Sequence, residues 1–166
     1  MGEEHDDPLE SRPPGIEDFV ALARSLHAEG VEYIVVGGMA VIHHGFVRAT
    51  EDIDLLVRST PENESRLRKA LLTLPDQAAR DLNPGDLDRY GVVRVADEIV
   101  VDLMRSACGI DYEAARGSVD VVRIRDVPIP FASADLLWRM KQTHREKDRL
   151  DRLFLEEKLR GGGREP

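Results

Sequence analysis

Apolar residues at the start of the chain change from helical to strand-like spacing. Apolar side chains follow Ile16 at positions three, four, seven and ten further on, which places them on one face of a helix that ends near Gly30. The run 31–36 is β-branched and aromatic and stops at the glycine pair 37–38, so it predicts a buried strand. Residues 39–44 predict a short helix, which completes an order of helix, strand and helix.

The pattern that follows predicts a second strand and a third helix. Residues 52–57 form a strand-like apolar run. Thr60 and Pro61 are typical of an N-cap and a first helical residue. The helix that they open has one leucine face, made of Leu67, Leu71 and Leu74. The polar stretch 75–88 contains an Asn-Pro-Gly turn signal, so it predicts a loop.

Strand-like runs and a long helical region fill the rest of the chain. The expected strands are 90–95, 98–104, 119–124 and a short piece at 127–129. Ser133 is the expected N-cap of a helical region that runs to about Arg160 and ends at the glycines 161–163. This order predicts a mixed α/β (α+β) domain, in which a small mixed sheet is flanked by helices and followed by C-terminal helices.

Composition indicates one domain with two short tails. The chain has 166 residues, of which 42% are hydrophobic, and this suits a single core. Residues 1–14 contain five acids, three prolines and few apolar side chains, so they bury too little surface to offset the entropy of ordering. We therefore expect a disordered tail over 1–14, a single domain over 15–160 and a flexible tail over 161–166.

Charge and cysteine content restrict the partners and the compartment. The 23 Lys and Arg residues oppose 32 Asp and Glu, and the net charge of -9 disfavours broad coating of nucleic acid while allowing a local basic or metal-filled site. Cys108 is the single cysteine, which suits a reducing compartment. The acidic N-terminus is unlike a signal peptide, and no apolar run is long enough to cross a bilayer. We expect a cytoplasmic protein without a membrane partner.

The glycine pair connects the first strand to the short helix. Gly37 and Gly38 leave unpaired backbone N–H groups at the helix start and carry no side chain that would block an anion. A tight strand-to-helix turn without any ligand explains the same pair equally well. The sequence alone leaves both interpretations open.

Two aspartates follow the glycine pair after thirteen intervening residues. Asp52 and Asp54 are two positions apart on the expected second strand, so both carboxylates project from one face. Such carboxylates repel each other unless a cation lies between them, and Mg²⁺ prefers oxygen ligands of this kind. Asp-x-Asp alone is also typical of a solvated strand, but its combination with the glycine pair favours adjacent phosphate and metal sites.

Residues 36–57 resemble the signature of the DNA polymerase beta-like nucleotidyltransferase superfamily, in which Gly-Gly or Gly-Ser precedes Asp-x-Asp at a similar spacing. The fuller pattern Gly-Gly-x-Ala, His-Gly and Arg-x-Thr-x-Asp-Ile-Asp-Leu resembles its small bacterial members, which include abortive-infection toxin nucleotidyltransferases and relatives of antibiotic nucleotidyltransferases. The resemblance implies a third carboxylate on a later strand, a two-metal site, and a nucleotide triphosphate that lies against Gly37 and Gly38.

Asp102 is the candidate for the third carboxylate. It lies in the middle of the apolar run 98–104, where a charge is costly unless it is paired or metal-bound. Asp97 and Glu98 at an expected hairpin turn are weaker candidates, and Asp120 is a more distant one. The predicted catalytic and metal-binding residues are therefore Asp52, Asp54 and Asp102.

Three further side chains are candidates for nucleotide contacts. Arg48 and Thr50 precede the aspartates, and Arg48 would either contact a phosphate or brace the fold through an ion pair with Glu51 or an Asp. Lys141 begins a charged stripe that is typical of a solvated helix face, whereas the resemblance implies that a lysine here faces the nucleotide. The predicted nucleotide-binding residues are Gly37, Gly38, Arg48, Thr50 and Lys141.

His43 and His44 are neighbours on the expected short helix. Side chains of adjacent helical residues point about 100° apart, which is poor geometry for a shared metal. We expect one histidine to pack against the protein and the other to face solvent.

Together these features predict a magnesium-dependent nucleotidyltransferase. Two Mg²⁺ ions, or Mn²⁺ in their place, would assist transfer of a nucleoside monophosphate from a nucleoside triphosphate such as ATP to an acceptor hydroxyl. The acceptor would be a tRNA, a protein or a small molecule, within a toxin-antitoxin or phage-defence system that includes a partner protein or a second copy of the chain. The alternative is a catalytically silent member of the same fold that binds nucleotide or a partner protein.

Overall fold

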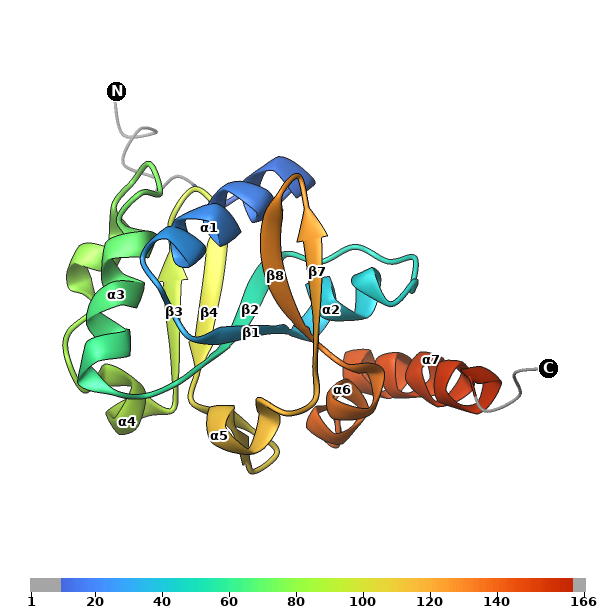
Figure 1. Cartoon of the computed structure of the whole chain (residues 1–166). Coiled ribbons are helices and arrows are strands. Elements are labelled where there is room, and N and C mark those ends of the chain that lie inside the picture. Colours follow the sequence, from blue (N-terminus) through green and yellow to red (C-terminus); the bar gives the residue numbers. More distant parts are fainter. Residues whose placement is uncertain (1–9, 163–166) are drawn as a thin grey trace, which may run out of the picture.

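A six-stranded mixed sheet forms the centre of the protein (Figure 1). The computed structural model describes residues 10–162. In chain order the strands of this sheet are β1 (Tyr33–Val36), β2 (Asp52–Val57), β3 (Val92–Ala96), β4 (Val100–Met104), β7 (Val119–Ile124) and β8 (Val127–Ala132). Their spatial order is β3-β4-β2-β1-β8-β7, in which β2 with β4 and β1 with β8 are parallel and the other pairs antiparallel. The predicted small mixed sheet is confirmed.

Helices flank this sheet, as the sequence predicted. The longer ones are α1 (Ile16–Ala28), α2 (Gly37–His43), α3 (Pro61–Leu71), α6 (Ala134–Met140) and α7 (Glu146–Gly162). Helix α1 packs against α3 and β8, α2 packs against β2, and α7 packs against α6 (Figure 1). The shorter elements are α4 (Asp86–Tyr90), α5 (Tyr112–Ala115), the 3₁₀ helix η2 (Ala78–Asp81) and a two-stranded sheet of β5 (Ser106–Ala107) and β6 (Ile110–Asp111).

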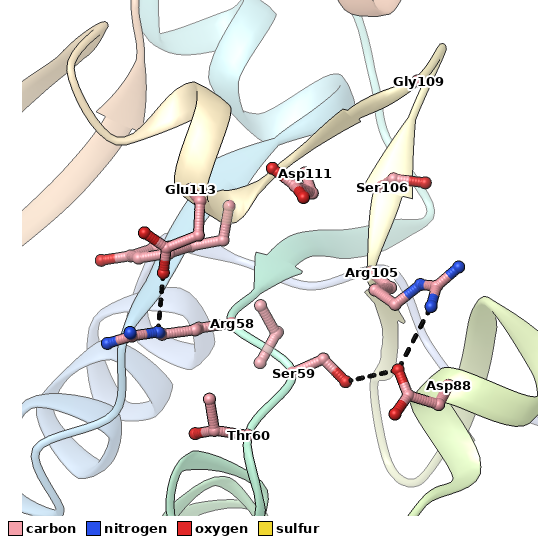
Figure 2. Close-up of a pocket in the computed structure, with 11 residues that line it drawn as sticks. Arg58, Ser59, Thr60, Asp88, Arg105, Ser106, Gly109, Asp111 and Glu113 are labelled. Atoms are coloured by element: carbon pink, nitrogen blue, oxygen red, sulfur yellow. Dashed lines mark hydrogen bonds and ion pairs between the residues drawn. The ribbon is translucent and has the colours of Figure 1, made fainter.

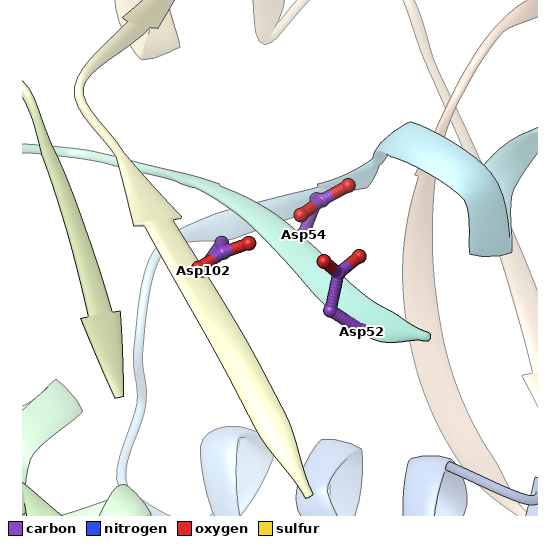
Figure 3. A group of neighbouring side chains, drawn as sticks. All are labelled: Asp52, Asp54 and Asp102. Atoms are coloured by element: carbon purple, nitrogen blue, oxygen red, sulfur yellow. The ribbon is translucent and has the colours of Figure 1, made fainter. Parts of the chain in front are cut away.

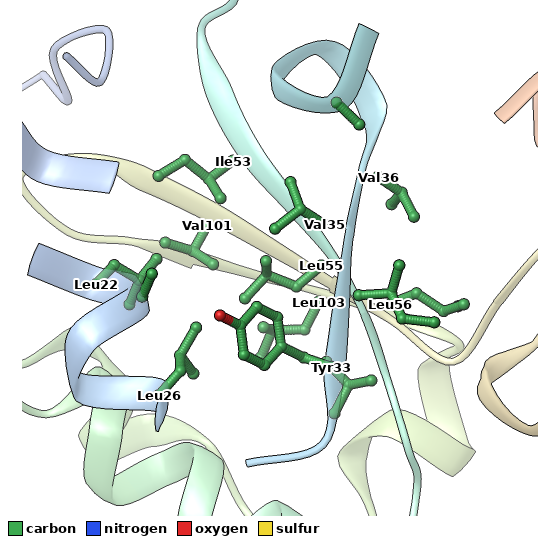
Figure 4. Close-up of a cluster of buried hydrophobic side chains, with 14 of the residues drawn as sticks. Leu22, Leu26, Tyr33, Val35, Val36, Ile53, Leu55, Leu56, Val101 and Leu103 are labelled. Carbon is green, nitrogen blue, oxygen red and sulfur yellow. The ribbon is translucent and has the colours of Figure 1, made fainter. Parts of the chain in front are cut away.

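Side-chain alternation along β2 separates the hydrophobic core from a polar face. Ile53 and Leu55 are buried in the core together with Leu22 and Leu26 of α1 (Figure 4). The two aspartates of β2 alternate with these residues and therefore project from the opposite face of the sheet. All four residues of β1 are buried, as expected for a strand between two others. One face of the central strands thus stabilises the fold and the other carries the acidic side chains.

Helix starts that the sequence marked with a capping residue are confirmed. The Thr60 hydroxyl accepts a hydrogen bond from the Asn63 backbone N–H at 3.2 Å. The Ser133 hydroxyl accepts one from the Leu136 N–H at 3.2 Å. A cap joins residues two or three positions apart, so sequence alone is sufficient to place it.

The predicted C-terminal helical region consists of two helices. The chain bends between α6 and α7 at Thr143, whose hydroxyl donates a hydrogen bond to the Asp148 carboxylate at 2.6 Å. Helix α7 runs to Gly162 and so includes two residues of the predicted flexible tail. The remaining tail, 163–166, lies outside the described residues.

The N-terminal segment 10–14, which we predicted to be disordered, contacts the turn between β3 and β4. The Arg12 backbone N–H donates to the Glu98 carbonyl oxygen at 2.9 Å, and the Ser11 hydroxyl donates to the Asp97 carbonyl oxygen at 2.6 Å. These hydrogen bonds hold a polar segment to backbone carbonyls far along the chain, and composition does not indicate such contacts. Residues 1–9 of the predicted tail lie outside the described residues.

The predicted loop 75–88 is more regular than expected, since it contains η2 and the start of α4. The buried Asp97 carboxylate accepts hydrogen bonds from the backbone N–H groups of Asp76 at 2.9 Å, Ala78 at 2.9 Å and Glu98 at 2.7 Å. An acid from a distant turn therefore orders the segment, which the local pattern cannot show.

Candidate active site

Three carboxylates that the sequence singled out meet on one face of the sheet (Figure 3). Asp52 and Asp54 lie on β2, and Asp102 lies on the adjacent β4, where the parallel register places it beside Asp54. One carboxylate oxygen of each residue lies within 4.8 Å of the other two. We call this group the aspartate cluster. The structure brings the three residues together, and their catalytic role remains a prediction.

The weaker candidates for the third carboxylate lie elsewhere. The Asp97 side chain is occupied by backbone N–H groups, as described above. Glu98 is half-exposed and lies 3.5 Å from the Arg12 guanidinium. Asp120 is on the edge strand β7, and two strands separate it from β2. Of these acids, Asp102 is the one placed beside the pair on β2.

Burial and mutual repulsion make the ionised form of two carboxylates in the aspartate cluster costly. Burial, followed by the charges of Asp52 and Asp102, raises the pKa of Asp54 to about 7. Burial and the neighbouring Asp102 also raise the pKa of Asp52. Carboxylate oxygens held this close together are the hard donors that Mg²⁺ and Mn²⁺ prefer. The residues therefore fit a divalent cation.

Arg94 is a member of this site that the sequence did not reveal. Its Nε donates to Asp102 Oδ1 and its Nη2 to Asp102 Oδ2, both at 2.9 Å. The same Nη2 lies 3.4 Å from Asp52 Oδ2. The sequence predicted a strand here, but only the antiparallel register of β3 and β4 places Arg94 directly opposite Asp102.

The glycine pair lies immediately beside the aspartate cluster. Gly37 has a φ of +66°, and a Cβ at this position would overlap the Asp54 carboxylate. A Cβ on Gly38 would lie 2.6 Å from Thr50 Oγ1 and 2.9 Å from Arg48 Nη2. Neighbouring side chains thus leave no room for a Cβ at either glycine, which agrees with the interpretation of the pair as a tight turn. Their contact with an anion remains a prediction.

Arg48 and Lys141 meet at an acid that the sequence analysis did not select. Asp151 of α7 is fully buried, and its Oδ2 lies 3.0 Å from Arg48 Nη2 and 2.9 Å from Lys141 Nζ. This contact is the bracing ion pair considered for Arg48, with Asp151 as the partner. Thr50 Oγ1 donates to the Asp52 carbonyl oxygen at 3.1 Å. These contacts hold the segment that leads into β2.

Both histidines of α2 contact β8, so the prediction that one faces solvent is wrong. The His43 ring stacks on Phe131 with centroids 3.9 Å apart, and His44 Nε2 lies 2.9 Å from the Ala132 carbonyl oxygen. His43 and His44 end α2 beside β8, so contacts with this strand, which the local pattern does not show, occupy both rings.

Two cavities adjoin at Ser106 on this side of the protein. The smaller has a volume of about 240 Å³ and is lined by Gly37, Asp54 and Lys141 among others. The larger has a volume of about 610 Å³ (Figure 2). Four of its charged lining side chains form two ion pairs, Arg58 with Glu113 and Arg105 with Asp88. The larger cavity therefore lies next to the one that borders the aspartate cluster.

No helix within residues 10–162 combines the length and the apolar character needed to cross a membrane.

The fold and the site together define a class of protein. A mixed sheet flanked by helices, with a glycine turn beside three strand-borne aspartates, is the arrangement of a nucleotidyltransferase fold. A family model described as "Nucleotidyl transferase AbiEii toxin, Type IV TA system", where TA denotes toxin-antitoxin, matches residues 20–149. The chain therefore belongs to the AbiEii family of nucleotidyltransferase toxins. The matched range contains the glycine pair and the whole aspartate cluster.

Comparison with solved structures agrees with this fold. A candidate nucleotidyltransferase from Thermotoga maritima superposes with a TM-score of 0.53 over 88% of this chain and 90% of that chain, at 16% sequence identity. At so low an identity the likeness concerns the fold alone. No curated protein sequence shows a significant match to the chain.

Proposed function

We propose that this protein transfers a nucleoside monophosphate from a nucleoside triphosphate to an acceptor hydroxyl, as the toxin of a toxin-antitoxin system. The observation that carries the proposal is the meeting of Asp52, Asp54 and Asp102 on adjacent strands. The glycine turn beside them and the membership in a family of nucleotidyltransferase toxins support the same reaction class.

The aspartate cluster would hold two divalent cations, Mg²⁺ in our proposal and Mn²⁺ as the alternative. Such ions, when bound, lower the pKa of an acceptor hydroxyl and neutralise charge on the triphosphate and the leaving pyrophosphate. The acceptor oxygen forms a bond to the α-phosphorus, and the bond from this phosphorus to the bridging oxygen breaks. Pyrophosphate leaves with the electron pair of that bond, and Asp102 receives the acceptor proton.

The remaining predicted residues would either contact the nucleotide or support the residues that do. Lys141 would contact the triphosphate, because it lines the same cavity as Asp54 and Gly37. Backbone N–H groups of Gly37 and Gly38 would face phosphate oxygens. Arg48 and Thr50 would shape the site, since Arg48 binds Asp151 and Thr50 binds the carbonyl oxygen of Asp52 at the start of β2.

The acceptor would be a tRNA, a protein or a small molecule. The type IV toxin-antitoxin description of the family favours an antitoxin as the partner protein, and a second copy of the chain is the alternative. The protein and its partner would act in the cytoplasm.

One observation favours the alternative of a catalytically silent nucleotide-binding protein. Arg94 already binds both carboxylate oxygens of Asp102 in this structure. A silent protein would be stabilised against heat by nucleotides and would show no transfer to any acceptor.

Transfer of label tests the proposed reaction. Each of the four α-³²P-labelled nucleoside triphosphates is incubated with Mg²⁺ and with total RNA, cell-lysate protein or small-molecule pools. Transfer should fall by about a hundredfold or more in Asp54→Asn, because a ligand to the cations is lost.

Asp120→Asn is the matched control, because this aspartate is exposed on the far edge strand β7. It should transfer label like the wild type. Unchanged transfer by Asp54→Asn would remove the proposed mechanism.

A further inference from the structure

Arg94 binds the oxygens that a cation at the aspartate cluster would use. Its guanidinium forms a bidentate pair with Asp102 and approaches Asp52 as well. Bidentate arginine–carboxylate pairs are among the stronger charge-assisted hydrogen bonds. Both carboxylate oxygens of Asp102 therefore accept hydrogen bonds from Arg94.

A divalent cation and this guanidinium exclude each other at close range. Both are positive, and like charges a few ångströms apart repel strongly where burial reduces solvent screening. The Asp102 side chain is 11% exposed, whereas the Arg94 side chain is 61% exposed. Asp102 is held in the sheet, so Arg94 is the partner that has freedom to move.

The surroundings of Arg94 leave room for that movement. Arg94 lies on the edge strand β3 and borders a cavity of about 270 Å³ together with Ser11, Glu51 and Asp52. A guanidinium that rotates away from Asp102 would face this cavity and solvent.

We propose that Arg94 is a positioning residue that compensates the charge of the aspartate cluster before a cation binds, and that it must release Asp102 for the cation to enter. The inference rests on the proposed metal site. Arg94 keeps the three carboxylates together in the metal-free protein, and it lowers the affinity of the site for divalent cations by competing with them. Cation entry is therefore an exchange, in which an ion pair within the protein is replaced by metal coordination.

Equilibrium binding of Mn²⁺ to the full chain tests this exchange. Free Mn²⁺ is measured from its electron paramagnetic resonance signal during a titration, without nucleotide or acceptor. Arg94→Gln should bind Mn²⁺ about tenfold more tightly than the wild type, because the cation no longer displaces a bidentate guanidinium. Arg94→Lys keeps the charge but loses the planar fork, so its affinity should lie between the two.

Arg123→Gln is the matched control, because Arg123 is an exposed arginine on β7, the opposite edge strand. Its Mn²⁺ affinity should equal that of the wild type. Thermal melts confirm that each variant is folded before the titration.

The possible results separate this inference from the proposed function. Equal or weaker Mn²⁺ binding by Arg94→Gln, with wild-type binding that Asp54→Asn abolishes, overturns the role of Arg94 and keeps the metal site. Absence of Mn²⁺ binding by the wild type and by Arg94→Gln overturns both.

Discussion

At the scale of single residues, the position of the Asp54 side chain depends on a glycine at position 37. The backbone at Gly37 is left-handed, and the Asp54 carboxylate occupies the space where any other residue would carry its Cβ. This close approach brings the start of α2 next to the aspartate cluster. A glycine here thus has a defined structural reason, whether or not an anion also binds.

Gly37→Ala should destabilise the protein and displace Asp54. Strain from the positive φ costs about 1–2 kcal/mol, and overlap with the carboxylate adds about 1–3 kcal/mol. Urea unfolding measures the change in the free energy of unfolding. Gly30→Ala is the matched control, because Gly30 has a φ of +73° and open space around its Cβ position. Equal losses in the two variants would contradict the close contact with Asp54.

At the scale of elements, the fully buried Asp151 is one connection between α7 and the rest of the domain, beside the buried Asp148, which also pairs with Lys141. Asp151 binds Arg48 in the segment before β2 and Lys141 at the end of α6. Several α7 side chains face solvent, and Leu150 and Leu153 are about half exposed. The ion-pair network therefore helps to hold α7 against the site, together with the buried Leu155 and the stacking of Phe154 on Phe46.

Asp151→Asn should loosen α7. Loss of the charge leaves Arg48 and Lys141 without their fully buried counter-ion, and breaking such a buried pair costs about 3–5 kcal/mol. Urea unfolding and amide hydrogen exchange measure the effect, with the fastest new exchange expected in α7. Asp135→Asn removes an exposed helical ion pair with Arg139 and should cost about 0.5 kcal/mol or less. Similar losses in both variants would show that Asp151 is not the connection.

At the scale of the whole molecule, the negative charge is concentrated rather than spread evenly. Of the 32 acids, five lie in residues 1–14 and three form the aspartate cluster. The other 24 face 22 basic residues once Arg12 is set aside with residues 1–14. The body of the domain is close to neutral, so the net charge of -9 is weak evidence against a polyanionic acceptor.

The raised pKa of Asp54 should make global stability depend on pH when divalent cations are chelated. The folded pKa of about 7 lies above the ordinary 3.8, so the folded state retains a proton that the unfolded chain releases between these values. Stability therefore falls as pH rises through this window. Asp54→Asn removes the contribution of this carboxyl group to the pH dependence. The variant should be more stable than the wild type at pH 8, by about 4 kcal/mol.

Urea unfolding between pH 4 and pH 8 in EDTA measures this difference, which should shrink toward pH 4. Asp120→Asn, on the exposed face of β7, should follow the wild-type pH dependence. Asp52, whose pKa is also raised, can leave part of the slope in Asp54→Asn, but a slope as steep as that of the wild type would contradict the assignment to Asp54.

Local interactions explain which parts of the fold and site could be predicted. The caps at Thr60 and Ser133, the strand over Asp52–Val57 and the shared face of Asp52 and Asp54 depend on neighbours in the chain, and their structure is as expected. Asp102 was selected because an acid in an apolar strand needs a partner. The hydrogen bonds of segment 10–14 could not be predicted because they join residues far apart in sequence.

The sequence by itself determined the mixed α/β class and the order of the central elements, because periodicity and caps are short-range properties. It also singled out the three aspartates as candidates, the third of them through the family resemblance. Only the tertiary structure decided the partners of those residues. Strand register placed Arg94 opposite Asp102, and the packing of α7 placed Asp151 between Arg48 and Lys141. These pairs join positions between 8 and 103 residues apart, and hydrophobic spacing along one chain carries no information about which strand edge or helix face will meet another.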